Sequence, residues 1–350
     1  MTSDLTPKQR LKRIAEGRDV DRVPSDFGIG HVAIRYIGAD MKRYAEDVAY
    51  KIDTDIAAYR AFGTEKLMSF FGVPELYGAT RVVPEKGQPY VQEVDPPTRD
   101  ELRRPRIENP KTDNRTKPTF DYLEGVLEKV GDEIPVAVAM EGPFTQIGRI
   151  IGTERLLRLT IRDPDYVFAF LESILQTQTT LVESLAGYDV GFGIMDPVSS
   201  NVVISAKDFR RFSKPYITRL FEVMTRISGK KPALHICGDT RKILRDIPET
   251  GAASFSVDNF MDLEHVKHEI GDRIPIIGNV KPTETMLLGT PADVDADLKQ
   301  CFRKAWDTPA GYIPGFGCGL PPDTPRENID QLYESLRKYG KWPLDPANFS

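Results

Sequence analysis

Short apolar runs alternate with longer amphipathic segments from about residue 119 to the end of the chain. The apolar runs are typical of strands buried on both faces, and the segments between them show helical periodicity. The predicted strands, with the loop residues that follow some of them, are 134–140, 190–194, 231–238, 254–258, 274–280 and 311–319, and the predicted helices are 120–130, 154–159, 165–186, 206–227, 241–249, 263–270, 292–305 and 328–339. This alternation with short connections predicts a parallel α/β sheet.

The amino-terminal third has a less regular pattern. Thr6-Pro7 is a helix start, and the helix predicted over 8–16 ends at Gly17. Mixed helical and extended patterns with scattered prolines follow, and they define no further elements. With no linker and no repeat, we expect a single domain over 1–350, in which 1–118 is a variable part with helical additions and 119–350 is the regular barrel part.

Polar or metal-binding residues stand immediately after most of the predicted strands. They are Glu141, Asp196, His235 with Cys237, Asp258, Asn279 and Cys318. Chemistry collected at the carboxyl ends of parallel strands is typical of the (β/α)₈ barrel. No glycine-rich dinucleotide fingerprint follows a strand, which disfavours a Rossmann fold. The sequence therefore predicts an α/β protein of the (β/α)₈ TIM-barrel class.

Composition limits the partners. The 350 residues carry a net charge of −5, so the basic surplus expected of a nucleic-acid-binding protein is missing. No apolar stretch approaches the roughly 18 residues needed to span a bilayer. The amino terminus has no apolar signal core and carries Asp4, so we expect a cytoplasmic protein that binds neither nucleic acid nor membrane.

His235 and Cys237 are candidate metal ligands. Residues two apart at the end of a strand point to the same face, and Cys318 ends another strand of the same predicted barrel. Two thiolates and one imidazole are a zinc-type ligand set, and three protein ligands leave the fourth position free for chemistry. Zinc could then present a bound thiol as a nucleophilic thiolate.

A packing role for the same residues stays open on spacing alone, because a histidine and a cysteine also occur together in cores. Gly317 and Gly319, which flank Cys318, favour the metal site, since they are not core-packing residues. The third cysteine, Cys301, follows a helical apolar pattern and is expected in the core. An odd, small number of cysteines does not form a disulfide framework.

Several segments resemble the uroporphyrinogen decarboxylase superfamily. They are Arg22-Val23-Pro24, Glu141-Gly142-Pro143-Phe144-Thr145, Asp196-Pro197 with Ile204-Ser205 and Phe209, His235-Ile236-Cys237-Gly238, Ile277-Gly278-Asn279-Val280 and the run from Gly317 to Ile329. The resemblance covers nearly the whole chain and is weakest between about 30 and 118. It implies a (β/α)₈ barrel.

Within that superfamily, the His and Cys pattern is similar to the methylcobamide:coenzyme M methyltransferases and their corrinoid-dependent relatives. The resemblance implies that His235, Cys237 and Cys318 bind Zn²⁺ and that zinc binds the acceptor thiol. It also implies a methylcobamide co-substrate carried by a partner corrinoid protein. True decarboxylases carry a histidine at the position of Cys318 and an early arginine-rich motif, whereas residues 24–30 here contain no arginine.

We therefore expect a zinc-containing, corrinoid-dependent methyltransferase that serves a small thiol such as coenzyme M or another acceptor. Glu141, Asp196 and Asn279 are candidates for orienting the substrate or the ligands, or for strand-end hydrogen bonds that fix loops. Three alternatives remain open at this point. They are a demethylase that loads methyl groups from O-, N- or S-methyl compounds onto cob(I)amide, a decarboxylase of the uroporphyrinogen type, and an inactive corrinoid-binding barrel.

Overall fold

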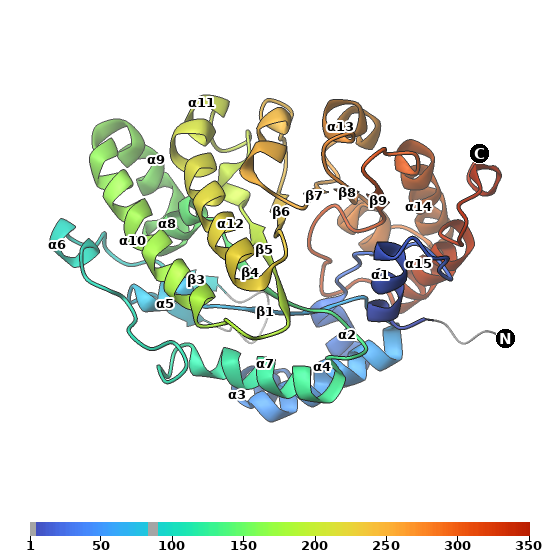
Figure 1. The fold of residues 1–350 in the computed structure, drawn as a ribbon, viewed down its shortest axis with the longest axis horizontal. Helices are drawn as coiled ribbons and strands as arrows, with labels where there is room; N and C mark the ends of the chain where they lie inside the picture. The colour runs from blue at the N-terminus through green and yellow to red at the C-terminus, as the bar shows by residue number, and fades with distance from the viewer. Residues whose placement is uncertain (1–4, 83–89) are drawn as a thin grey trace.

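A parallel sheet of seven strands forms the centre of the computed structural model, which describes residues 5–82 and 90–350 (Figure 1). The strands follow the order β1 (Leu67–Phe70), β4 (Val136–Glu141), β5 (Val190–Met195), β6 (Ala233–Ile236), β7 (Ser254–Val257), β8 (Ile276–Ile277) and β9 (Tyr312–Ile313). A separate antiparallel pair consists of β2 (Thr80–Val82) and β3 (Tyr90–Gln92). The predicted α/β barrel class is confirmed, and β1 shows that the sheet takes its first strand from the amino-terminal part.

The gap between β9 and β1 is filled by the segment around Asp26. Its backbone forms an isolated parallel bridge with Gly315, just beyond β9. Its carboxylate lies 2.7 Å from the Lys66 ammonium, immediately before β1. Among the described residues the eighth position of the barrel is therefore occupied by a single bridge rather than by a regular strand.

Helices cover the outside of the sheet, as Figure 1 shows. In chain order the α-helices are α1 (Pro7–Ala15), α2 (Gly30–Tyr36), α3 (Met41–Glu46), α4 (Val48–Phe62), α5 (Val73–Leu76), α6 (Arg99–Leu102), α7 (Lys117–Val130), α8 (Pro143–Ile151), α9 (Thr153–Arg162), α10 (Pro164–Glu183), α11 (Ala206–Asp208), α12 (Lys214–Ser228), α13 (Leu263–Ile270), α14 (Pro291–Ala305) and α15 (Arg326–Tyr339). Most predicted helices are present within a few residues of their expected bounds.

The helix expected over 241–249 is wrong. The chain there forms two short 3₁₀ turns, Leu244–Asp246 and Pro248–Thr250. Pro248 has no N–H to donate to the carbonyl four residues earlier, so an α-helix cannot continue through it. A similar effect divides the predicted helix over 206–227, where a π-helical turn, Phe209–Ser213, precedes Pro215. The last two strands are also shorter than expected.

Alternate residues of the strands face the helices and the barrel interior. The Gln178 amide nitrogen on α10 lies 4.0 Å from the Met140 sulfur, so Met140 faces the helices. Glu141, the next residue, therefore faces inward. The strand register pairs Glu141 with Met195 and Met195 with His235. Because paired residues in neighbouring strands face the same side, these three residues lie in one interior layer near the carboxyl ends of the strands.

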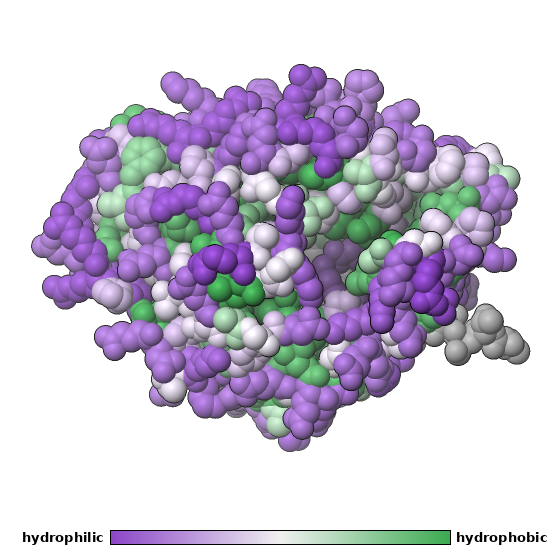
Figure 2. Space-filling view, in the orientation of Figure 1, coloured by the Kyte–Doolittle hydropathy of each residue, from purple (hydrophilic) through white to green (hydrophobic). Residues whose placement is uncertain are grey.

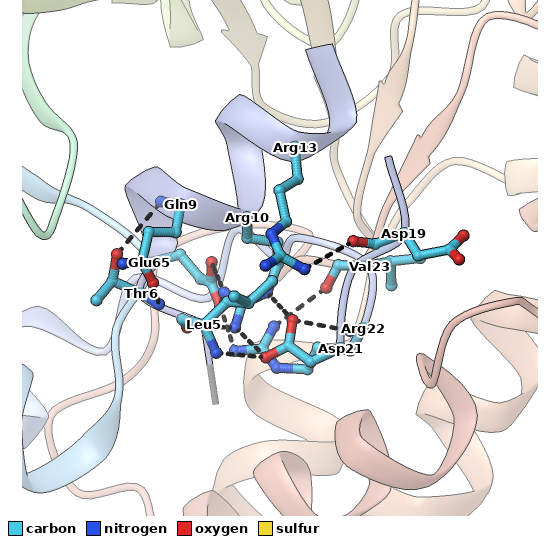
Figure 3. Close-up of polar contacts among 10 residues, drawn as sticks. All are labelled: Leu5, Thr6, Gln9, Arg10, Arg13, Asp19, Asp21, Arg22, Val23 and Glu65. Carbon is cyan, nitrogen blue, oxygen red and sulfur yellow. Dashed lines mark hydrogen bonds and ion pairs between the residues drawn. The ribbon is translucent and has the colours of Figure 1, made fainter. Parts of the chain in front are cut away.

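Figure 3 shows a cluster of largely buried charges that joins α1, the segment after it and Glu65. Arg10 on α1 donates to both Glu65 oxygens at 2.9 and 3.0 Å and to both Asp21 oxygens at 2.7 and 2.8 Å. Arg22 forms a second ion pair with Glu65. Glu65 immediately precedes Lys66 and β1, so this cluster ties α1 and the segment after it to the start of the sheet.

The surface of the face seen in Figure 2 is mostly hydrophilic, with apolar side chains scattered over it. The same view shows a hollow near the middle, between α12 on one side and α1 on the other (Figures 1 and 2). Among the described residues, no helix combines the length and apolarity needed to cross a bilayer.

Candidate metal centre

Three potential metal ligands meet at the carboxyl end of the barrel. His235 lies in β6, Cys237 follows the end of that strand, and Cys318 lies in the loop after β9. The His235 Nε2 atom is 3.1 Å from the Cys237 sulfur, and the two sulfurs are 3.6 Å apart. All three donor atoms lie within 4.8 Å of one another. The structure thus brings together residues that are 81 positions apart in the chain.

The His235 ring is oriented from the neighbouring strand. Its Nδ1 lies 3.1 Å from the Ser256 carbonyl oxygen and 3.0 Å from the Ser256 hydroxyl oxygen. A proton on Nδ1 would be donated to the carbonyl, which leaves the lone pair of Nε2 directed at the two sulfurs. Metal-binding histidines commonly have this arrangement, because the second hydrogen bond fixes both tautomer and ring orientation. Sequence reasoning missed Ser256, since only the pairing of β6 with β7 brings it to His235.

The two sulfurs are close enough for one thiol to donate a hydrogen bond to the other. A hydrogen bond from Cys237 lowers the pKa of the Cys318 thiol to about 4, and a second contact with His235 acts in the same direction. The same hydrogen bond, followed by burial, raises the pKa of Cys237 far above its usual range. The pair therefore loses its first proton readily and its second with difficulty, as expected of two coupled groups.

The donor set fits zinc. Two sulfurs and one imidazole nitrogen are ligands that zinc favours, and a set of three, with no fourth His, Cys, Asp or Glu ligand among the described residues, is typical of catalytic zinc sites. All three side chains are partly exposed, so a small molecule can reach them. Cys301, by contrast, is 4 % exposed and lies in the core, as expected for the third cysteine.

Glu141 forms an ion pair at the edge of this site. The Arg149 Nε and Nη2 atoms each lie 3.0 Å from Glu141 Oε1. Burial raises the pKa of the Glu141 carboxyl, and the Arg149 charge opposes that rise. The positive charge of Arg149, from α8, also opposes the rise in the pKa of Cys237. Sequence reasoning missed Arg149, because it lies on a helix and not at the end of a strand.

Asp196 is completely buried beneath the site. Its carboxylate accepts hydrogen bonds from the Thr145 hydroxyl at 2.5 Å and the Ser213 hydroxyl at 2.8 Å, and its backbone N–H donates to the His235 carbonyl at 2.8 Å. Burial raises the pKa of this carboxyl. Since no part of Asp196 is exposed, these contacts fit a residue that fixes the loops around β5 and β6.

Asn279 also bonds to neighbouring loops. Its amide nitrogen donates to the carbonyls of Asp258 at 3.0 Å and Met261 at 2.7 Å. The side chain is 8 % exposed. These two bonds hold the loop after β7 against the end of β8. Of the three candidate orienting residues, Glu141 is thus the one placed in the interior layer with His235, whereas Asp196 and Asn279 support the loops.

The sequence is similar to those of known proteins over most of its length. The family model for uroporphyrinogen decarboxylase (URO-D) matches residues 6–339. The chain is 28 % identical over 358 residues to the methylcobamide:CoM methyltransferase MtaA of Methanosarcina barkeri, covering 96 % of this chain and 99 % of that protein. It is 20 % identical to the uroporphyrinogen decarboxylase of Gloeobacter violaceus, covering 85 % and 86 % of the two chains.

Among solved structures, a methyltransferase from Methanosarcina mazei superposes with a TM-score of 0.79. The two chains are 22 % identical, and the match covers 95 % of this chain and 98 % of the other. At that level of identity the likeness establishes the fold, which is shared over nearly the full length of both proteins.

Proposed function

Because the chain belongs to the uroporphyrinogen decarboxylase family, we propose that it is a zinc-dependent methyltransferase that exchanges a methyl group between a methylcobamide and a small thiol. The convergence of His235, Cys237 and Cys318 within 4.8 Å carries this proposal. The relatives named as methylcobamide:CoM methyltransferases support it, since they align over almost the entire chain.

The reaction balances as a nucleophilic displacement. The thiolate sulfur donates an electron pair to the methyl carbon and forms the S–C bond. The Co–C bond breaks, its electron pair stays on cobalt as cob(I)amide, and the thiol proton leaves to solvent. Zinc held by the three ligands would supply a Lewis acid that keeps the bound thiol deprotonated near neutral pH.

The chain's own residues provide position and charge. Ser256 fixes the His235 ring so that Nε2 faces the sulfurs. Asp196 joins the loop after β5 to the His235 backbone. Glu141 and Arg149 form the charged edge of the site, where they would contact a molecule bound to the metal. The methylcobamide is expected to arrive on a partner corrinoid protein and to approach from the open carboxyl end of the barrel.

The direct test combines metal analysis with a methyl-transfer assay. Purified protein should contain about one zinc per chain, and it should transfer methyl groups from free methylcobalamin to at least one member of a panel of small thiols. Absence of zinc together with absence of thiol methylation would overturn the proposal. Demethylation of O-, N- or S-methyl compounds with supplied cob(I)alamin, without thiol turnover, would show instead that the chain loads the corrinoid.

Decarboxylation is the less favoured chemistry. A porphyrinogen carries several carboxylates that require cationic partners, and residues 24–30 contain none of the arginines expected there. The third ligand is also a thiol and not an imidazole. Measurement of carbon dioxide release from uroporphyrinogen tests this alternative in the same protein preparation.

A further inference from the structure

The residues that the structure describes do not fill the barrel interior below the candidate metal centre. Gly191 and Gly193 on β5 share the inward face with Met195 because they alternate with it along the strand. Among the atoms of residues 5–82 and 90–350, a Cβ atom added to Gly191 would meet none within 4 Å, and one added to Gly193 would meet only the Ala233 backbone oxygen at 3.7 Å. The interior therefore contains open space next to β5.

The adjoining wall of this space, formed by β4 and β1, is apolar and accessible. The register pairs Met68 with Ala137 and Phe70 with Ala139, so both β1 side chains face the interior together with these alanines and Glu141. Met68 is 37 % exposed and Phe70 is 44 % exposed. Such exposure of large apolar side chains inside a barrel means that solvent reaches them. We call this space the interior cavity, defined by Met68, Phe70, Ala137, Gly191 and Gly193.

Stability does not explain the interior cavity. Barrel interiors are ordinarily filled by bulky branched side chains, which bury apolar surface and favour strands. Glycine within a strand is unfavourable and often marks a place where a ligand approaches the backbone. At Gly191 an added Cβ atom meets no described atom within 4 Å and φ lies outside the left-handed region, so a side chain could begin there without strain. Retained open space of this kind is expected where a ligand occupies it.

The cavity joins the candidate metal centre directly. Gly193 pairs with Ala233, and His235 lies two residues further along the same face of β6. The interior face of the sheet has a charged pair at each end. Glu141 pairs with Arg149 at the carboxyl end, and Lys66 pairs with Asp26 at the amino end, so the opposite charges in each pair offset each other. A molecule held at the three ligands would therefore meet an apolar wall when it extends into the barrel.

We propose that the interior cavity binds an apolar alkyl or aryl group attached to the sulfur of the substrate thiol. This inference rests on the proposed methyltransferase function and narrows its substrate class to thiols with an apolar substituent. The sulfur stays at the metal ligands, and the substituent packs along the inner face of β5, β4 and β1, over Gly191 and Gly193 and toward Met68 and Phe70.

The first test measures the cavity without using zinc or methyl transfer. Toluene is titrated into metal-free protein, and binding is followed by calorimetry and by the rise in melting temperature. The wild-type chain should bind toluene, and Gly191→Val and Gly193→Leu should abolish binding. Gly193→Ala is the matched control, because one methyl group leaves most of the space free. No binding to the wild-type chain, or unchanged binding to both filled variants, would overturn the proposal.

The second test uses a series of straight-chain thiols from ethanethiol to hexanethiol, with 2-mercaptoethanesulfonate as the anionic comparison. Each added methylene should tighten binding to zinc-loaded protein by about fourfold until the cavity is full. Gly193→Leu should remove this dependence and leave zinc content unchanged. Thiol methylation with no dependence on chain length would overturn the cavity proposal but not the proposed function. Toluene binding without any thiol methylation would overturn the proposed function but not the existence of the cavity.

Discussion

The two ends of the barrel hold polar clusters of different kinds. At the amino end, Arg10 is 2 % exposed, and its guanidinium donates to Asp21, to Glu65 and to the Leu5 carbonyl. At the carboxyl end, the Cys237 sulfur lies 3.6 Å from the Cys318 sulfur and 3.1 Å from the His235 Nε2 atom. The first cluster is satisfied by oppositely charged groups of the chain, whereas the second consists of electron-pair donors that converge on one point.

This difference separates stability from chemistry. A buried charge is tolerated when oppositely charged partners and hydrogen bonds surround it, and removing one partner is then costly. Converging sulfur and imidazole donors are the groups that hold a metal ion, so the loss of one of them is expected to lower metal affinity first. The amino end is therefore expected to govern unfolding, and the carboxyl end to govern metal content and turnover.

The largest effect should follow the loss of a sulfur ligand. Cys237→Ala and Cys318→Ala should each reduce zinc content well below one per chain and reduce methyl transfer to background, while the melting curve stays cooperative. Plasma emission spectroscopy of the purified variants measures the zinc. Cys301→Ala is the control, since this buried cysteine lies outside the cluster and should leave zinc in place. Full zinc in a Cys237/Cys318 double variant would refute the assignment.

At the opposite end, Glu65→Ala should destabilise the fold by about 3–5 kcal/mol, because it leaves two arginines without a shared partner. Urea unfolding monitored by circular dichroism gives the free energy. The zinc content of the folded variant should equal that of the wild-type chain. A stability loss below about 1 kcal/mol would show that the charges of this cluster are not coupled as the geometry indicates.

A smaller effect is expected at the residue that orients the histidine. Ser256→Ala should weaken zinc affinity by about tenfold, at the lower end of the range for such supporting residues, since the Ser256 carbonyl still accepts from the ring. Competition with a chromogenic chelator measures the affinity. Ser254→Ala, two residues earlier on the same strand, is the comparison and should leave affinity unchanged.

The smallest effect concerns pH. Hydrogen bonding and charge from Arg10 outweigh burial and lower the pKa of Asp21 in the folded chain. Its contribution is therefore present above the unfolded pKa of about 3.9 and is lost as pH falls through the lower folded value. Asp21→Asn should cost about 1–2 kcal/mol at pH 7 and flatten the loss of stability below pH 4. An unchanged acid limb in urea titrations at several pH values would contradict this role.

Much of the barrel could be predicted because its strands are apolar and its helices amphipathic. Strand β7 and helix α13 lie within a residue of their expected bounds. Each of them is ended by the residues next to it in the sequence and not by distant parts of the chain. The three metal ligands were predictable for a related reason. Side chains two apart on a strand share a face, and strand ends in a parallel barrel meet at one opening.

Other features follow only from packing across the barrel. Two 3₁₀ turns replace the helix expected over 241–249, the Asp26 bridge takes the place of an eighth strand, and Ser256 and Arg149 reach the site from neighbouring elements. The sequence by itself determined which residues carry sulfur and imidazole, and on which face of a strand they lie. Only the tertiary structure decided their separation and the open interior beside Gly191, because distances between strands depend on register and closure, which no local pattern contains.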